Sequence, residues 1–188
     1  MRITGGRLGG RILKAPAGRA IRPSADRLRE SLFNALLHRA DNPIEAAHVI
    51  DLFAGTGALG LEALSRGAAS ALFVDHGTEA RALIRANVEA LGVGGVTRIF
   101  RRDATRLGQA PEPGRFRLAF LDPPYGQGLA RPALCALRDG AWLGPGALTI
   151  IEESADGALD LPEGFTFDAR RVYGDTQVVF ASFTPKNL

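Results

Sequence analysis

The chain has one cysteine, Cys135, among 188 residues, so it can form no internal disulfide and no multi-cysteine metal site. Its three histidines have no metal-ligand spacing, and we expect no metal. No apolar run approaches the roughly 18 residues that span a bilayer, and the basic N-terminus lacks the apolar segment of a signal peptide. We therefore expect a cytoplasmic protein. With 46% apolar residues, it should fold around one core.

Positive charge is concentrated at the N-terminus. The net charge is only +3, and beyond residue 30 acidic residues outnumber basic ones. Within residues 1–30, two acids accompany eight basic residues: Arg2, Arg7, Arg11, Lys14, Arg19, Arg22, Arg27 and Arg29. Arginine binds phosphates well, so this charge predicts a polyanionic partner. A solvated, solubilising arm is the alternative. We divide the chain into a basic arm with a hairpin, residues 1–22, and a main domain, residues 23–188.

An amphipathic helix is predicted from Ser24 to about Arg39. Arg29 falls in the middle of its apolar face, whereas Arg27 lies nearly opposite. A guanidinium pointing toward the body needs an anionic partner. That partner could be a structural acid or a bound phosphate, and the sequence does not decide between them.

Strand and helix patterns alternate through the main domain, which predicts an α/β fold with a parallel sheet. The last two strands are joined by only four residues and should form an antiparallel hairpin at the edge of the sheet. The predicted strands are 48–53, 70–75, 96–100, 116–121, 146–152, 165–172 and 177–183. The predicted helices are 58–66, 78–91 and 128–138, with a weaker helical turn near 104–108.

A glycine turn follows the first of these strands. Gly55 and Gly57 permit positive φ and close approach of a ligand, and the helix that begins beyond them favours an anion. With Gly60 they match G-x-G-x-x-G, and Asp75 follows at about the spacing of a ribose-binding acid. An NAD site fits this pattern, as does a turn made only for packing. Against NAD, Asp51 stands where dinucleotide-binding folds usually carry apolar residues.

Acidic residues recur where the predicted parallel strands end. Asp51, Asp75, Asp103 and Asp122 belong to four consecutive strands. In open parallel sheets ligands bind beyond the carboxyl ends of the strands, near the switch in strand order. One crevice could therefore hold all four side chains.

The tetrapeptide Asp122-Pro123-Pro124-Tyr125 suits a planar group bearing an amine. The two prolines lack N–H donors and leave backbone carbonyls pointing outward. Asp122 adds an acceptor, and Tyr125 adds a flat stacking face. Acceptors at Asp122 and at the carbonyl of Pro123 would favour a pyramidal, nucleophilic nitrogen, by positioning and electrostatics alone. Such an amine requires an electrophilic methyl group, as on a sulfonium.

The tetrapeptide, following a Gly-x-Gly turn and two intervening acids, resembles the amino-methyltransferases that use S-adenosylmethionine. The chain is further similar to the RsmD family over nearly its whole length. The matching segments are Gly5-Gly6, Gly10-Arg11, Arg22-Pro23-Ser24, Asp26-Arg27, Arg29-Glu30, Phe33-Asn34, residues 51–68 and Tyr173-Gly174-Asp175-Thr176. The family commonly has glutamate where Asp75 stands and threonine where Ser24 stands.

The resemblance implies a Rossmann-like class I methyltransferase fold: a seven-stranded, mainly parallel sheet whose last strand is antiparallel. It also implies methylation of guanine N2 in 16S ribosomal RNA, on free RNA or on the small ribosomal subunit, and we expect a monomer. The cofactor would be S-adenosylmethionine, bound by Asp51, Phe53, Gly55, Gly57, Asp75, Asp103 and Ala104. The catalytic residues would be Asp122, Pro123, Pro124 and Tyr125. The RNA-binding candidates are Arg7, Arg11, Arg22, Arg27 and Arg29, which could instead hold the arm over the pocket.

Other functions stay open. A DNA adenine or cytosine amino-methyltransferase is one, although no sizeable sequence-reading domain is visible in 188 residues. A protein glutamine methyltransferase typically carries asparagine where Asp122 stands. A cofactor-binding RNA chaperone without turnover would not need Asp122 and Tyr125. Elsewhere, Glu152 and Glu153 end a strand, and we expect both to be solvated.

Overall fold

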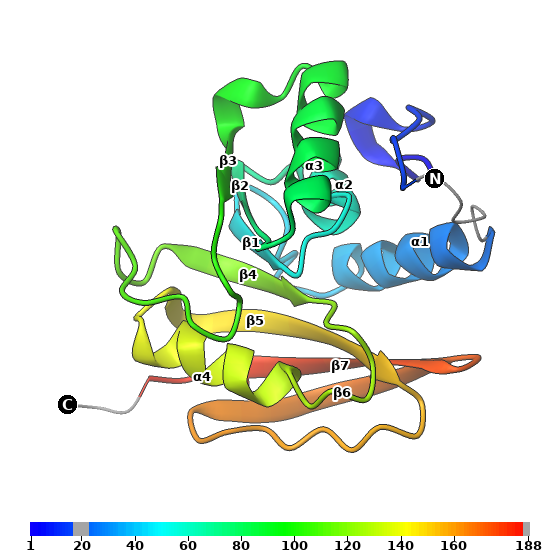
Figure 1. Ribbon diagram of the computed structural model, residues 1–188. Helices are drawn as coiled ribbons and strands as arrows, with labels where there is room; N and C mark the ends of the chain where they lie inside the picture. The colour runs from blue at the N-terminus through cyan, green and yellow to red at the C-terminus, as the bar shows by residue number, and fades with distance from the viewer. Residues whose placement is uncertain (17–22, 186–188) are drawn as a thin grey trace.

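The computed structural model describes residues 1–16 and 23–185. They form a single seven-stranded sheet with helices on both faces (Figure 1). The strands are β1 (His48–Leu52), β2 (Ser70–Val74), β3 (Thr97–Phe100), β4 (Phe116–Leu121), β5 (Leu143–Ser154), β6 (Phe165–Tyr173) and β7 (Thr176–Phe183). The helices are α1 (Pro23–Leu37), α2 (Ala58–Ser65), α3 (Thr78–Leu91) and α4 (Ala130–Asp139), with short 3-10 turns η1 (Gly6–Leu8) and η2 (Gly94–Val96).

The strand order is β3-β2-β1-β4-β5-β7-β6. The first five strands pair in parallel, whereas β7 is antiparallel to both of its neighbours. The chain moves outward from β1 to β3 and then returns to place β4 on the other side of β1. The order therefore switches between β1 and β4, where ligands bind in folds of this kind.

Apolar clusters cover both faces of the sheet. On one face, α4 packs with the segment after β3 around Trp142, which is fully buried. On the other, Leu32, Phe33 and Leu36 of α1 pack against β1, β4, β5 and β7. A third cluster joins α2 and α3 to the N-terminal arm. Two covered faces explain why the inner strands are almost continuously apolar.

The N-terminal arm folds back on itself and lies against α2 and α3 (Figure 1). Arg2 and Ile12 form an isolated antiparallel bridge. Ile3 and Leu8 are buried against the helices. Asn87 of α3 bonds both backbone groups of Lys14, at 2.7 and 3.1 Å. The described part of the arm is therefore paired with itself and docked on the body.

The predicted strands and helices are confirmed apart from shifts at their ends, and the final hairpin lies at the sheet's edge as expected. The predicted helical turn near 104–108 is wrong, because this segment forms turns without a helix. Its apolar spacing has another cause: Ala104 and Leu107 are buried in the cluster around α4.

Candidate functional site

The glycine turn after β1 has an unusual backbone. Phe53, Gly55 and Gly57 all have positive φ, of 57°, 56° and 78°. This conformation costs little at glycine but is uncommon for phenylalanine, and such strain clusters at ligand sites. A Cβ at Gly55 would meet only the carbonyl oxygen of Phe53, at 3.8 Å. The turn thus leaves its backbone open to a ligand.

Asp51 lies beneath the start of α2 and is only 1% exposed. Its Oδ2 accepts a hydrogen bond from the backbone N–H of Gly60, at 2.9 Å. Burial raises the pKa of Asp51 to about 8; the Gly60 bond opposes that rise, and the nearby charge of Asp75 adds to it. A Cβ on Gly60 would lie 2.4 Å from the ring of Phe73, so only glycine brings the helix this close to Asp51.

Asp75, at the end of β2, is bonded to the glycine turn. Its Oδ2 accepts from the N–H of Gly55 at 2.9 Å, and its Oδ1 accepts from the N–H of Gly77 at 2.7 Å. Each carboxylate oxygen can accept more than one hydrogen bond. Asp75 is therefore held in place while keeping acceptor capacity for a pair of hydroxyl groups.

Asp103 follows β3 and is exposed. Its Oδ1 accepts from the hydroxyl and the backbone N–H of Thr105, at 2.7 and 2.8 Å. These two bonds lower the pKa of Asp103, and the charges of Arg106 and His76 assist. The N–H of Asp75 donates to the carbonyl of Phe100 at the end of β3, at 3.2 Å, so the ends of β2 and β3 lie side by side.

The tetrapeptide leaves β4 beside β1. The N–H of Asp122 points to the carbonyl of Leu52, at 3.5 Å, so Asp122 begins its loop next to the turn that contains Phe53. Pro123 is buried, whereas Asp122 and Pro124 are exposed. Strand pairing thus brings the tetrapeptide to the glycine turn, at the switch in strand order.

The hydroxyl group of Tyr125 is hydrogen-bonded to residues of β5 and β7. The hydroxyl donates to Glu152 Oε1 at 2.5 Å and lies 3.1 Å from the hydroxyl of Thr176. Burial and then the bond to the Glu152 carboxylate raise the pKa of Tyr125, whereas the bond to Thr176 opposes that rise. The side chain is nevertheless 42% exposed, so its ring is both anchored and accessible.

The expectation that Glu152 and Glu153 are solvated is wrong. Glu153 is 5% exposed, and its Oε1 accepts from the N–H groups of Gly126 and Ser154. Glu152 is partly buried and bonds Tyr125. Both acids thus contact the tetrapeptide loop or the residue that follows it. The sequence did contain a signal for them, because both acids lie at the carboxyl end of β5. The same strand-end rule located the other four acids.

Arg29 has structural acids as partners, so the structure corrects its placement among the RNA-binding candidates. It is 4% exposed and pairs with Asp26 at 2.9 Å and with Glu62 at 3.4 Å. It also donates to the carbonyl of Arg2. Sequence reasoning missed Glu62, which is fully buried at the centre of this network; it also bonds Thr4, Gly5 and Arg66.

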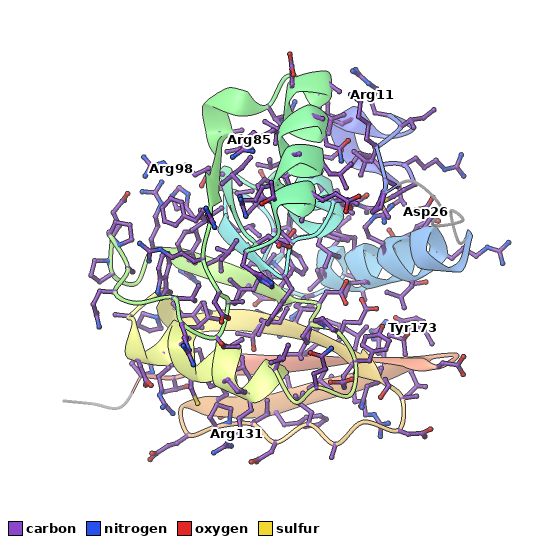
Figure 2. The ribbon with its side chains drawn as sticks, viewed as in Figure 1. Arg11, Asp26, Arg85, Arg98, Arg131 and Tyr173 are labelled. Atoms are coloured by element: carbon purple, nitrogen blue, oxygen red, sulfur yellow. The ribbon has the colours of Figure 1, made fainter. Side chains whose placement is uncertain are left out.

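The other candidate arginines differ from Arg29. Arg7, Arg11 and Arg27 are exposed, and none forms an ion pair within residues 1–16 and 23–185. Arg11, on the arm in Figure 2, donates to the carbonyl of Ala90 at the end of α3. Arg22 lies outside the described residues. The exposed charges therefore lie on the arm and at the start of α1.

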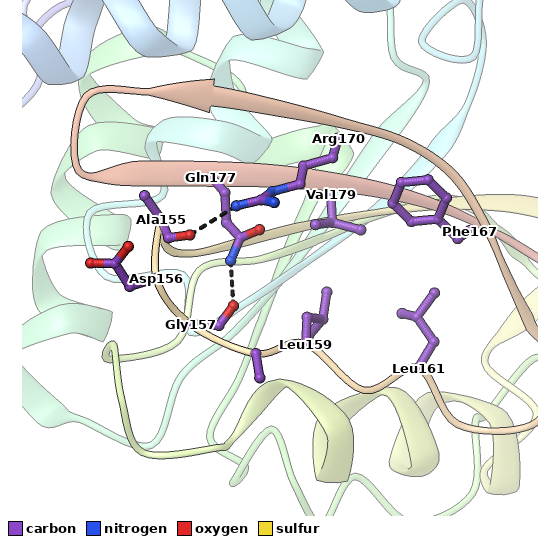
Figure 3. Close-up of a pocket in the computed structure, with 10 residues that line it drawn as sticks. Ala155, Asp156, Gly157, Leu159, Leu161, Phe167, Arg170, Gln177 and Val179 are labelled. Atoms are coloured by element: carbon purple, nitrogen blue, oxygen red, sulfur yellow. Dashed lines mark hydrogen bonds between the residues drawn. The ribbon is translucent and has the colours of Figure 1, made fainter.

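A separate cavity of about 680 Å³ lies between the β6–β7 hairpin and the segment after β5 (Figure 3). Leu159, Leu161, Phe167 and Val179 supply its apolar lining. Arg170 and Gln177 bond the nearby backbone, as in the 2.5 Å bond from Gln177 to the carbonyl of Gly157. None of the predicted site residues lines it.

No group of three or more potential metal ligands occurs among residues 1–16 and 23–185. Within those same segments, no helix is long and apolar enough to cross a bilayer.

Comparison with known proteins gives consistent relatives. Residues 1–182 match the family described as Conserved hypothetical protein 95. Ribosomal RNA small subunit methyltransferase D of Escherichia coli is 34% identical over 175 residues, which cover 93% of this chain and 85% of the relative. The enzyme of the same name from Haemophilus influenzae is 32% identical over 176 residues, covering 93% and 89%.

Solved structures agree with these relatives. The Escherichia coli protein yhhF superposes with a TM-score of 0.82 at 30% identity, covering 99% of both chains. An RNA methyltransferase from Salinibacter ruber, solved with S-adenosyl-L-homocysteine, gives a TM-score of 0.61 and covers 85% of this chain and 94% of its own. At 15% identity, this second likeness concerns the fold alone.

Proposed function

This chain belongs to the family of ribosomal RNA small subunit methyltransferase D, and on that premise we propose that it methylates the exocyclic N2 of a guanine in 16S ribosomal RNA. Its fold is the predicted class I methyltransferase fold. Family membership makes it an rRNA methyltransferase that uses S-adenosylmethionine. Guanine as the target base, and its exocyclic N2 as the methylated atom, are what we propose beyond family membership.

The residues around the glycine turn fit S-adenosylmethionine. The open backbone at Gly55 admits a ligand, and the fixed carboxylate of Asp75 suits the two ribose hydroxyls. Asp103 and Ala104 would meet the adenine, and Asp51 with Phe53 the methionine end. When bound, this cofactor supplies an electrophilic methyl group on a sulfonium. Asp51 is protonated below about pH 8 in the free protein, and a cationic ligand group beside it would favour its ionised form.

One observation carries the proposal most directly: the N–H of Asp122 lies 3.5 Å from the carbonyl of Leu52, beside the glycine turn. An amine held by Asp122 and the carbonyl of Pro123 would therefore lie close to the methyl donor. A cofactor held at the glycine turn would supply the methyl group and keep the electrons of its carbon–sulfur bond, while Asp122 or water would accept the proton that the amine loses. Positioning and electrostatics account for such catalysis without a covalent enzyme intermediate.

Tyr125 and the arm supply the contacts to RNA. The target guanine would stack on the exposed ring of Tyr125, after leaving its own base stack at a cost of a few kcal/mol. Arg7, Arg11 and Arg27, with Arg22 as a further candidate, would meet phosphates. Phosphate contacts position the substrate, and RNA is recognised largely by shape.

The deciding experiment compares methyl acceptors side by side. S-adenosylmethionine with a labelled methyl group is incubated with unmodified small ribosomal subunits, free 16S RNA, duplex DNA and protein. Nucleoside digestion and mass spectrometry then identify the product. We expect N2-methylguanosine from the subunits or the free RNA. Label on adenine or cytosine of DNA, or on glutamine, would replace the proposal with one of the alternatives, and binding without label on any acceptor would favour the chaperone.

A further inference from the structure

The hydroxyl group of Tyr125 is held at two points by residues distant in the sequence. Glu152 Oε1, near the end of β5, accepts its proton at 2.5 Å. Thr176, the first residue of β7, places its hydroxyl at 3.1 Å. Glu152 and Thr176 lie near one another because β5 and β7 pair antiparallel, with Glu152 opposite Val178 and Ser154 opposite Thr176. The final hairpin of the sheet therefore reaches the tetrapeptide loop.

A second contact holds the next residue of the loop. The backbone N–H of Gly126 donates to Glu153 Oε1 at 3.2 Å. Neighbouring residues of a strand point to opposite faces, so Glu152 and Glu153 contact the loop from the two sides of β5. Glu153 is buried and also accepts from the N–H of Ser154 at 2.8 Å, so its position is itself fixed.

We propose that Glu152 and Thr176 are positioning residues that fix the ring of Tyr125 for stacking against the target base. The inference rests on the proposed function, in which Tyr125 contacts the guanine. A phenol ring anchored at its hydroxyl cannot swing about its side-chain torsions. Its face is then preorganised, and less conformational entropy is lost when the base arrives.

The electrostatics of the group agree with this geometry. Burial raises the pKa of Glu152, while the hydrogen bond from Tyr125 lowers it. The pKa of Tyr125 is raised by burial first and by its bond to Glu152 second. The raised pKa of Tyr125 keeps the phenol proton on its oxygen, where it can donate to Glu152. A hydrogen bond to a carboxylate is among the stronger ones.

A double-mutant cycle tests whether Glu152 acts through Tyr125. Glu152→Ala and Tyr125→Phe should each lower kcat/KM for RNA, by roughly tenfold, and leave the Kd for S-adenosylmethionine unchanged. The double variant should be no worse than either single variant. Glu89→Ala, the same substitution at an exposed site on α3, is the matched control and should retain full activity. If Glu152→Ala lowers kcat/KM by the same factor in the wild-type chain and in Tyr125→Phe, the inference is overturned.

Two variants of Thr176 provide a second test if Glu152→Ala does not fold. Thr176→Val removes the hydroxyl at nearly constant volume and should lower kcat/KM, whereas Thr176→Ser should restore most of it. Thr166→Val, at an exposed position of β6, is the control. A serine variant as impaired as the valine variant would show that the hydroxyl is not what matters, contrary to the inference.

An absorbance titration tests the hydrogen bond without any activity. The chain has two tyrosines, so Tyr173→Phe leaves Tyr125 alone to ionise near 295 nm. Its midpoint should lie above the ordinary value of about 10, and adding Glu152→Gln should move it down. A midpoint near 10 that stays the same when Glu152→Gln is added would overturn the inference. A wild-type chain that methylates no RNA would instead overturn the proposed function, so the two failures are distinguishable.

Discussion

The backbone N–H of Gly55 donates a 2.9 Å hydrogen bond to Asp75 Oδ2. This bond joins the glycine turn after β1 to the acid that ends β2, two features separated by 20 residues. The turn and the acid therefore form one unit before any ligand is present. A ligand that contacts the turn will meet the carboxylate of Asp75 in a fixed position.

Removing this carboxylate should weaken cofactor binding. Asp75→Ala deletes the partner of Gly55 and Gly77 together with the proposed acceptor for the ribose hydroxyls. We expect the Kd for S-adenosylmethionine to rise at least about tenfold, as for loss of a charged hydrogen-bonding group, measured by titration calorimetry. Asp75→Glu, which restores the commoner residue of the family, should bind nearly as well as wild type. Unchanged affinity in Asp75→Ala would remove Asp75 from the cofactor site.

The positions of the strand-end acids could be predicted because they depend on chain direction alone. Parallel strands place their carboxyl ends at one edge of a sheet, so Asp51, Asp75, Asp103 and Asp122 could be grouped without knowing a single contact. The same rule applied to Glu152 and Glu153, but nothing in the sequence indicated that the tetrapeptide loop turns toward β5. That approach depends on how β4, β5 and β7 pair.

Arg29 shows a different limit of prediction from sequence, because two kinds of anionic partner were open for it. Helical periodicity placed its guanidinium on the apolar face, which was correct, and required an anionic partner. The structure supplies two partners: Asp26 on the same helix, and Glu62, which could be identified only from the packing of α1 against α2, across 33 residues. Periodicity describes one element at a time, so it could demand an acid without saying which element supplies it.

Asp51 should make stability fall as pH rises. Its pKa is raised from an ordinary 3.8 to about 8 in the folded chain, so the folded state binds this proton more tightly than the unfolded state. The free energy of unfolding therefore decreases from about pH 4 to pH 8 and levels off above that. Asp51→Asn, whose amide oxygen can still accept from Gly60, should remove this dependence.

Urea unfolding of Asp51→Asn at pH 5 and pH 8 provides the measurement. The variant should gain stability over wild type mainly at pH 8, because burying a carboxylate is then most costly. Glu79→Gln, at an exposed site on α3, is the control and should follow wild type at both values. If wild type and Asp51→Asn differ by the same amount at pH 5 and pH 8, burial of Asp51 does not control its ionisation.

Asp122→Ala should separate binding from catalysis. Asp122 is exposed at the site and contributes its N–H, not its side chain, to the contact with Leu52. The variant should therefore fold and bind S-adenosylmethionine normally while methyl transfer falls by roughly 100-fold or more, the scale of losing one preorganised polar group. Single-turnover transfer to RNA is the measurement. Turnover at the wild-type rate would end the argument that this carboxylate activates the amine.

The exposed arginines of the arm should control the salt dependence of RNA binding. If Arg7 and Arg11 contact phosphates, Arg7→Gln with Arg11→Gln should weaken binding and reduce the slope of log K against log salt by about 1 to 2. Arg85→Gln with Arg98→Gln removes the same charge from α3 and β3 and serves as the control (Figure 2). Equal slopes for the two double variants would mean that net charge, and not the arm, governs binding.

Arg29 should respond as a structural residue, which distinguishes it from the other arginines of this region. Arg29→Met removes a charge that Glu62, fully buried, and Asp26 both contact. Removing one partner of a buried pair usually costs about 3–5 kcal/mol, but Glu62 keeps its bonds to Thr4, Gly5 and Arg66. We therefore expect a loss of about 2 kcal/mol in the free energy of unfolding, the middle of the range for an unsatisfied buried group, measured by chemical unfolding. Because the arm and α1 both bond this network, the loss of stability should appear as faster amide hydrogen exchange at Thr4 and Gly5. A variant with wild-type stability but a shallower salt slope for RNA would return Arg29 to the phosphate-binding set.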